Sequence, residues 1–396
     1  MKLTPDVIRR MRAQMPALRR QIYVNWGGSG PSPLPVLREV DRVLKREAAL
    51  GPFHPKVREE GRALFAALRK EVAELMAAGE DEIAFADNTT SGVNLAAAGI
   101  EWRLGDEVIV SDLEHPGGYL PWLVWRDRRR VKVRLLPTGA SDKELLGRLD
   151  SLLRPQTRAV CMSHVAWLTG RRLPLKEIAL RCRKVGALLV VDGAQSVGQM
   201  PVDAPALGAD VYTLSGQKWL MGPQGTGAVF VKKGLQRRIR EAAAGYRSAK
   251  EKALPTLTYL PHESAARFEV ATVSPALFAG LRAAVARCLQ AGPAAIEARV
   301  ASLAGRLLEI LRSDEGVEVL SPAGPAQSGL VSFRVRGVKA EEAVNALLGR
   351  HKVVLRSVDA DPPAIRASIH YLNTEAEAER IGGAVLKLAR RRKRKR

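Results

Sequence analysis

Short apolar runs alternate with amphipathic segments over the first two-thirds of the chain. In residues 55–78 and 173–186, apolar side chains recur at helical spacing, which predicts two amphipathic helices. Strand-length apolar runs occur at residues 82–87, 106–112, 158–164, 187–193 and 210–215. Because buried parallel strands are nearly continuous in apolar residues, this alternation predicts an α/β domain with a mostly parallel sheet.

The pattern changes after about residue 260. An Ala- and Leu-rich stretch at 276–312 predicts a helix pair, and strand-like runs then flank a helical segment at 340–349. The strand-like runs lie at 329–335, 353–358 and 364–372. We therefore expect four parts: an N-terminal helical arm (1–20), a large domain (21–260), a smaller C-terminal α+β domain (261–388) and a basic tail (389–396).

The chain of 396 residues is strongly basic, with 63 Lys and Arg against 41 Asp and Glu and a net charge of +22. Such a charge attracts nucleic acids and anionic surfaces. Since no aromatic side chains interleave with the basic ones, a solvated surface is favoured over a nucleic-acid-binding function. No run of 18 apolar residues is present, so we expect no membrane span.

The cysteines and histidines indicate which kinds of site are not expected in this chain. Cys161, Cys182 and Cys288 are far apart and odd in number, which predicts no disulfide framework and fits a reducing cytoplasm. The six histidines lack the spacing of a metal site, and we expect no metal. Neither GxxxxGK[ST] nor GxSxG is present, which disfavours a P-loop or an α/β-hydrolase nucleophile.

Polar residues follow the predicted strands where each strand ends. Ligands of parallel α/β sheets bind beyond these carboxyl ends. We therefore expect one site built from residues 87–90, 111–112, 163–164, Asp192 and Ser215.

Lys218 lies close to this edge, within the turn-like sequence LSGQKW. It can be an ordinary surface lysine or a desolvated one with a lowered pKa, suited to a Schiff base. Asp192 can cap the following segment or face a protonated pyridine nitrogen, and Thr89 and Thr90 can cap a helix or hold a phosphate. Together, the lysine, the aspartate and the phosphate seat describe a pyridoxal phosphate (PLP) site.

Seven segments in order resemble the class V, fold-type I PLP enzymes, which include cysteine desulfurases and isopenicillin N epimerase. They are DNTTSGVN (87–94), SDLEHPGGYLPW (111–122), SHVAWLTGRRLP (163–174), LVVDGAQSVG (189–198), LSGQKWLMGPQG (214–225), RFEVAT (267–272) and RASIHYLNT (366–374). The resemblance spans nearly the whole chain. It implies a large domain with a mostly parallel, seven-stranded sheet and a smaller C-terminal domain.

The resemblance also implies a role for each matching residue. Lys218 would form the internal aldimine and carry the Cα proton, and Asp192 would hold the pyridinium proton. His115 would stack on the ring and Gln195 would bind its phenolic oxygen. The implied phosphate ligands are Thr89, Thr90, Ser215, Gln217 and, from the neighbouring subunit of a homodimer, Thr272. Arg366 would bind the substrate carboxylate.

Several positions depart from the family pattern. Gln217 stands where a histidine is usual, Trp167 where desulfurases carry an asparagine, and Ala271 where a glycine is usual. Residues 355–366 hold no cysteine at the place where desulfurases present their nucleophile. Because a desulfurase needs that thiolate to attack the substrate sulfur, desulfurase activity is disfavoured.

The segments YVNWGGSGPSPLP (23–35), EHPGG (114–118) and SHVAWLTG (163–170) are more similar to C–S lyases and epimerase-like members. This similarity implies β-elimination from a cystine- or cysteine-type substrate, which needs no catalytic cysteine. Asn25 is a candidate substrate contact or a plain turn residue, and Trp167 is expected to shape the pocket. Transamination and epimerisation share the first step of this chemistry and stay open as alternatives.

Overall fold

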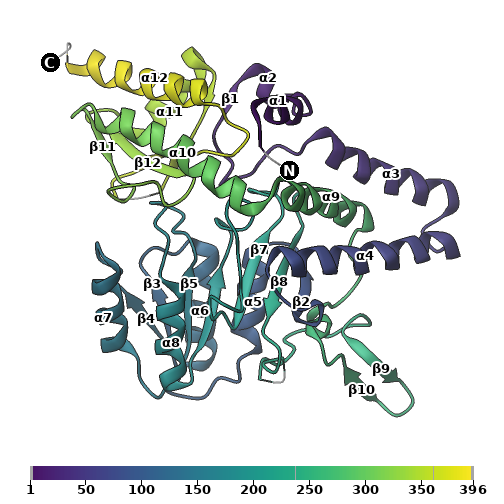
Figure 1. Cartoon of the computed structure of the whole chain (residues 1–396). Helices are drawn as coiled ribbons and strands as arrows, with labels where there is room; N and C mark the ends of the chain where they lie inside the picture. Colours follow the sequence, from purple (N-terminus) through teal and green to yellow (C-terminus); the bar gives the residue numbers. More distant parts are fainter. Residues whose placement is uncertain (1–2, 237, 360, 394–396) are drawn as a thin grey trace.

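A seven-stranded sheet forms the centre of the large domain in the computed structural model, which describes residues 3–236, 238–359 and 361–393 (Figure 1). The strand order is β2-β8-β7-β6-β5-β3-β4, and β8 alone runs antiparallel to its neighbours. The mostly parallel sheet is thus confirmed. Its strands are β2 (Ile83–Ala86), β3 (Glu107–Ser111), β4 (Lys132–Leu136), β5 (Thr157–Ser163), β6 (Leu188–Asp192), β7 (Val211–Ser215) and β8 (Gly227–Val231).

Helices cover both faces of this sheet, which explains the continuous apolar runs. On one face, α5 (Thr89–Gly99) and α6 (Pro116–Arg129) pack on alternate strand residues such as Val108 and Val190. On the other face, α7 (Asp142–Leu152), α8 (Leu175–Val185) and α4 (Pro55–Leu75) pack on the intervening residues, such as Ile109 and Leu189. The helices predicted at 55–78 and 173–186 are therefore present.

The N-terminal segment forms several short elements instead of one helix. α1 (Pro5–Ala13) and α2 (Ala17–Arg20) are separated at Pro16, and α1 buries Val7, Ile8 and Met11. β1 (Ile22–Tyr23) then pairs in parallel with β13 of the C-terminal region. α3 (Leu34–Leu50) follows and lies beside α9 and α4 (Figure 1).

The C-terminal region is the smaller α+β unit that the sequence predicts. Its antiparallel sheet has the order β11-β12-β15-β14 and packs on helices α10, α11 and α12. The elements are α9 (Pro275–Ala291), α10 (Pro293–Arg312), β11 (Val317–Val319), β12 (Leu330–Val335), α11 (Ala340–His351), β13 (Val353–Val354), β14 (Arg356–Val358), β15 (Ala364–Ser368) and α12 (Glu375–Lys393). Of the basic tail at 389–396, residues 394–396 lie outside the described residues. The predicted domain boundaries stay predictions.

Some elements carry no hydrophobic pattern that predicts them. The hairpin of β9 (Ala249–Ala253) and β10 (Thr258–Pro261) is mostly exposed, and so is much of edge strand β4. Short 3₁₀ turns, η1 (Glu80–Glu82) and η2 (Ala265–Phe268), complete the chain.

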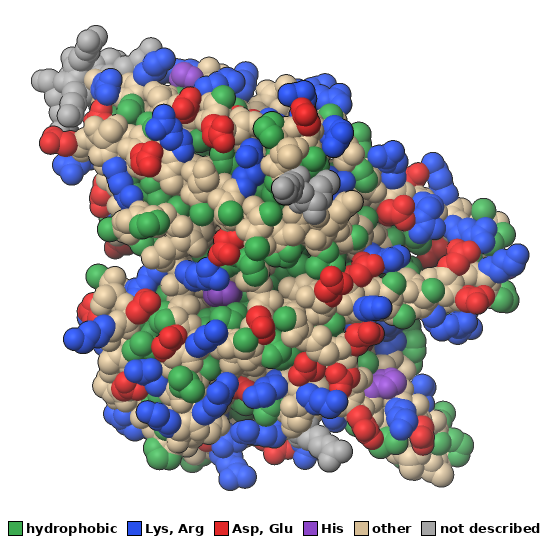
Figure 2. Space-filling view, viewed as in Figure 1, with side chains coloured by type: hydrophobic (Ala, Val, Ile, Leu, Met, Phe, Trp, Pro, Cys, Tyr) green, Lys and Arg blue, Asp and Glu red, His purple; other side chains and the backbone are tan. Residues whose placement is uncertain are grey.

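Positive and negative side chains are intermixed over the face that Figure 2 shows, without gathering into one basic patch there. Within the described part of the chain, no helix is both long and apolar enough to cross a membrane.

Candidate active site

A cavity of about 760 Å³ opens at the carboxyl ends of the central strands. Nine of the twelve residues proposed from the sequence line it: Thr89, Thr90, His115, Trp167, Asp192, Gln195, Ser215, Gln217 and Lys218. Ser163 and Asn88 also line it, so most of the predicted strand ends converge as expected. Asp112 and His164 do not line this cavity.

Lys218 reaches the cavity from the turn that follows β7. Burial, with Arg366 and Arg356 nearby, lowers the pKa of Lys218 to about 8, and Asp192 acts in the opposite direction. A lysine with this pKa sheds its proton far more readily than a solvated one. Lys218 is therefore suited to act as a nucleophilic amine and to carry protons.

Asp192 and Gln195 form the wall at the end of β6. The Asp192 carboxylate is buried and accepts a hydrogen bond from Ala194 N at 2.9 Å. The Gln195 amide donates to Gly27 O at 2.9 Å and accepts from Trp219 Nε1 at 3.0 Å. These bonds fix the Gln195 side chain and leave one of its N–H groups available to a ligand.

A cluster of hydroxyls lies at the N-terminus of α5. Thr89 N donates to Ser215 Oγ at 3.0 Å, and the two hydroxyls lie 2.9 Å apart. Asn88 caps the helix by accepting from Ser91 N at 3.0 Å. Helix N-termini attract anions through their free N–H groups and dipole, so this corner can hold a phosphate.

His115 and Trp167 meet on another side of the cavity, where their rings are edge to face with centroids 5.3 Å apart. His115 is the N-cap of α6, and its Nδ1 accepts from Gly117 N at 3.1 Å. Burial, together with Lys218, lowers the pKa of His115. A neutral imidazole ring is thus presented to the cavity.

Arg366 lies just behind this wall. It is 1% exposed, it donates to Trp167 O at 2.7 Å, and its guanidinium carbon lies 5.9 Å from the centroid of the Trp167 ring. Its Nε and Nη2 are buried without a hydrogen-bond partner. Burial, together with Arg356, lowers the pKa of Arg366 to about 9. Buried donors of this kind are costly unless a ligand satisfies them.

Two further predicted residues do not line the cavity. Asn25 lies behind Gly28, and its Oδ1 is buried without a hydrogen-bond partner. Thr272 is exposed and bonded to the Tyr246 hydroxyl at 2.8 Å. A role for Thr272 within its own subunit's site is therefore not supported by its position.

Two residues at or beside the cavity, Arg356 and Glu114, were not predicted from the sequence. Arg356 lines the cavity from β14, directly opposite Arg366 on β15. Glu114 is buried beside the cavity wall next to His115. No sequence pattern marks Arg356, whereas the position of Glu114 directly before His115 was an available signal.

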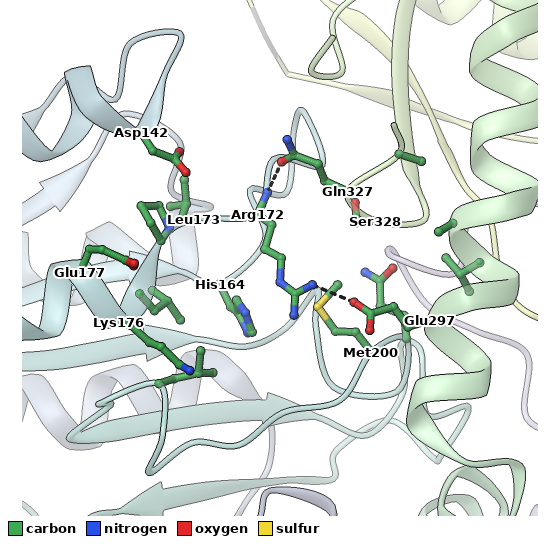
Figure 3. Close-up of a pocket in the computed structure, with 17 residues that line it drawn as sticks. Asp142, His164, Arg172, Leu173, Lys176, Glu177, Met200, Glu297, Gln327 and Ser328 are labelled. Atoms are coloured by element: carbon green, nitrogen blue, oxygen red, sulfur yellow. Dashed lines mark hydrogen bonds and ion pairs between the residues drawn. The ribbon is translucent and has the colours of Figure 1, made fainter. Parts of the chain in front are cut away.

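A second cavity, of about 460 Å³, lies between α8 and α10 (Figure 3). Arg172 spans it and bonds to Glu297 at 2.7 Å, while Arg172 N donates to Gln327 at 2.9 Å. His164 lies on its wall, which explains why this residue is absent from the first cavity. None of the twelve residues to which the sequence assigns a role at the PLP site lines this second cavity.

The chain matches the model of the class V aminotransferases over residues 22–381. It is 29% identical to a probable cysteine desulfurase of Methanothermobacter thermautotrophicus (96% of this chain, 97% of that one). It is 31% identical to isopenicillin N epimerase of Amycolatopsis lactamdurans (93% and 95%). It is also similar to a complex between the cystine C–S lyase C-DES and its product cysteine persulfide, with 31% identity, a TM-score of 0.88 and 94% and 99% coverage.

This chain belongs to the class V aminotransferase family, and it has the fold-type I architecture. It is a PLP-dependent enzyme; a structure of a C-DES variant has glycine covalently linked to the PLP cofactor. The residues present fit this cofactor. The cavity joins a lysine of lowered pKa, a buried aspartate and hydroxyls at a helix N-terminus.

Proposed function

We propose that this chain is a C–S lyase that cleaves cystine or a related cysteine derivative by β-elimination, releasing pyruvate, ammonia and a thiol or persulfide. The observation that carries the proposal is a cavity lined by a lysine of lowered pKa and, among the described residues, by no cysteine. Elimination from cystine needs water but neither an oxidant nor a protein nucleophile at sulfur. A persulfide is a good leaving group because it is a weaker base than a simple thiolate.

The three cysteines are unsuited to desulfurase chemistry. Cys161, Cys182 and Cys288 are buried, free, and absent from the cavity lining. Burial raises the pKa of Cys182 and of Cys288 to about 12, and that of Cys161 well above its ordinary value. Since the thiolate is the nucleophile, these thiols are inert at neutral pH. Their free state also agrees with the proposed cytoplasmic location.

We assign the following roles to the cavity residues. PLP, when bound, supplies an electron sink for the substrate Cα. Lys218 would take the Cα proton, and Asp192 would hold a proton on the pyridine nitrogen. His115 would pack against the ring, Gln195 would donate to its phenolic oxygen, and Trp167 would contact the substrate. The phosphate would be held by Thr89, Thr90, Ser215 and Gln217.

Two arginines at the cavity favour a substrate that carries two carboxylates. Arg356 and Arg366 are directly opposite on antiparallel strands, and neither forms an ion pair within the described residues. Like charges at such positions repel, so anions between them are favoured. Cystine carries two α-carboxylates, and one could bind Arg366 while the other binds Arg356. Such pairs can be bidentate.

A homodimer is part of this proposal. Thr272 is exposed outside its own subunit's cavity, as expected of a residue that would complete the phosphate site of a partner. Sedimentation of the purified protein tests the dimer, and a monomer with full PLP affinity would contradict it.

Epimerisation or transamination is the alternative, favoured by the similarity to isopenicillin N epimerase. Removal of the Cα proton by Lys218 is common to all these reactions. They differ in where the proton returns and whether a group leaves from Cβ.

Pyruvate release from L-cystine by the PLP-loaded protein tests the proposal, with Lys218→Ala as the blank. We expect prompt release from wild type and none from the variant. Arg356→Gln should raise KM for cystine by about tenfold and leave KM for S-methylcysteine, which has one carboxylate, nearly unchanged. Exchange of the Cα proton without pyruvate would contradict elimination and favour the alternative.

A further inference from the structure

A buried carboxyl group lies directly behind the cavity wall. Glu114, between β3 and α6, is 7% exposed and accepts three hydrogen bonds. Its donors are Ser111 Oγ at 2.6 Å, Ser163 N at 2.8 Å and Ser163 Oγ at 2.7 Å. No cation forms an ion pair with Glu114 among the described residues. Three donors favour the ionised form, whereas burial opposes it.

Glu114 is connected to Asp192 through Ser163. Ser163 on β5 is the register partner of Asp192 on β6, and both residues line the cavity. Gly118 shows how near the two carboxyl groups are. A Cβ at Gly118 would stand 2.9 Å from Glu114 Oε2 and 3.7 Å from Asp192 Oδ2. The two acidic groups thus share one small space at the start of α6.

The charges in this space act on one another. Burial and Asp192 raise the pKa of Glu114 to about 7, while its bonds to Ser111 and Ser163 oppose the rise. Glu114 in turn contributes to the raised pKa of Cys161 on β5. Two interacting carboxyl groups of unequal environment are a recurrent way of setting protonation at an active site.

We propose that Glu114 is a positioning residue for the pyridine end of the cofactor. It turns the Ser163 hydroxyl hydrogen away from the cavity, and in its ionised form its negative charge adds to that of Asp192, so that protons on the bound cofactor are held more tightly. This inference depends on the cofactor and not on the proposed reaction, so a failed pyruvate assay leaves it standing.

Glu114→Gln tests the proposal because it removes the charge and keeps the size. The visible absorbance of the bound PLP is titrated with pH in the absence of substrate. We expect the midpoint to move to lower pH by about one unit and PLP to bind about tenfold more weakly. A midpoint equal to that of wild type, with PLP bound, would overturn the proposal, because a purely structural Glu114 lowers stability without moving the titration.

Glu107→Gln is the matched control. Glu107 is a buried glutamate at the start of β3, the strand that precedes Glu114, and it is paired with Arg134 at 3.1 Å. Its substitution should leave the absorbance midpoint unchanged. If Glu114→Gln does not fold, Ser111→Ala replaces it. Ser111→Ala removes one hydrogen bond that stabilises the ionised Glu114. It should lower the absorbance midpoint by a smaller amount than Glu114→Gln. An unchanged midpoint in Ser111→Ala would contradict the proposal.

Discussion

At the scale of single residues, several side chains in and around the site are buried in surroundings that disfavour their charged forms. Lys218 is a partly desolvated amine, Arg366 is a buried cation with unsatisfied donors, and Glu114 is a buried carboxyl group without a cation. In the cofactor-free protein, a bound aldehyde can relieve the cost of burying Lys218 and a bound anion the cost of burying Arg366. Perturbed groups that gather in one cavity are typical of functional sites.

Lys218→Met should stabilise the cofactor-free protein at pH 7. The pKa of Lys218 is lowered from 10.5 to about 8, so the unfolded state binds more protons between these values. The destabilisation of the folded state by the buried Lys218 charge is fully present below pH 8, and it disappears as the pH rises to 10.5. Urea unfolding should therefore show a gain at pH 7 that shrinks through this window. The exposed Lys184→Met is the control, with a change within about 0.5 kcal/mol.

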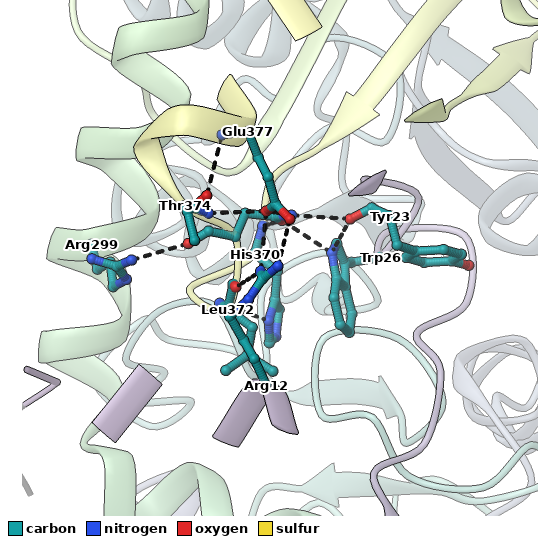
Figure 4. A network of polar contacts seen from close by, with 9 residues as sticks. Arg12, Tyr23, Trp26, Arg299, His370, Leu372, Thr374 and Glu377 are labelled. Atoms are coloured by element: carbon teal, nitrogen blue, oxygen red, sulfur yellow. Dashed lines mark hydrogen bonds and ion pairs between the residues drawn. The ribbon is translucent and has the colours of Figure 1, made fainter. Parts of the chain in front are cut away.

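At the scale of elements, the N-terminal helix α1 is bonded to the turn at residues 370–374, directly before α12. Arg12 of α1 donates to Leu372 O at 2.5 Å and pairs with Glu377 at 2.6 Å (Figure 4). Asn373 bonds to Glu377 at 3.0 Å and to Trp26 Nε1 at 3.1 Å. Trp26 directly precedes the glycine whose carbonyl accepts from Gln195. A chain of contacts thus leads from α1 to the cavity wall.

Arg12→Met should destabilise the protein by about 2 kcal/mol, because it leaves a nearly buried Glu377 without its cation. Urea unfolding measures the loss, and hydrogen exchange should report faster opening of residues 5–13. Arg9→Met on the same helix is the control. Its partner Asp6 and Arg9 itself are 75% and 79% exposed, so its effect should stay below about 1 kcal/mol. Equal losses for both variants would refute the anchoring role.

At the scale of the molecule, stability depends on two histidines that are buried without charge in its interior. His370 lies between Trp26 and Trp219 and donates through Nε2 to Trp219 O at 3.1 Å, next to Lys218. His164 bonds to the Tyr212 hydroxyl at 2.8 Å beneath the sheet edge. Burial lowers the pKa of each to about 3. Both rings must therefore be neutral in the folded state.

Stability should consequently fall in mild acid. The folded-state pKa values lie below 6.5, so the unfolded state binds more protons as the pH falls from 6.5 toward 3. Each histidine can contribute up to about 1.4 kcal/mol of loss per pH unit. Urea unfolding at pH 7, 6 and 5 measures this slope. His164→Gln should reduce it, whereas His351→Gln, at a half-exposed position, should not.

The sequence by itself determined five of the seven strands of the large sheet, several of the helices and the polar strand ends. Apolar periodicity and strand-end chemistry are local properties, and a parallel sheet brings its strand ends together without further information. Thr89, Asp192, Ser215 and Lys218 could therefore be proposed as one site from the chain alone, and the structure places them around one cavity.

Only the tertiary structure decided which charged side chains lie close together. Arg356 faces Arg366 because β14 and β15 pair in one register, and Glu114 approaches Asp192 because Gly118 leaves room. Trp167 covers Arg366, and Arg12 reaches Glu377 across the whole chain. These contacts depend on packing between segments far apart in sequence, and burial together with the neighbouring charges then sets the pKa values on which the proposed chemistry depends.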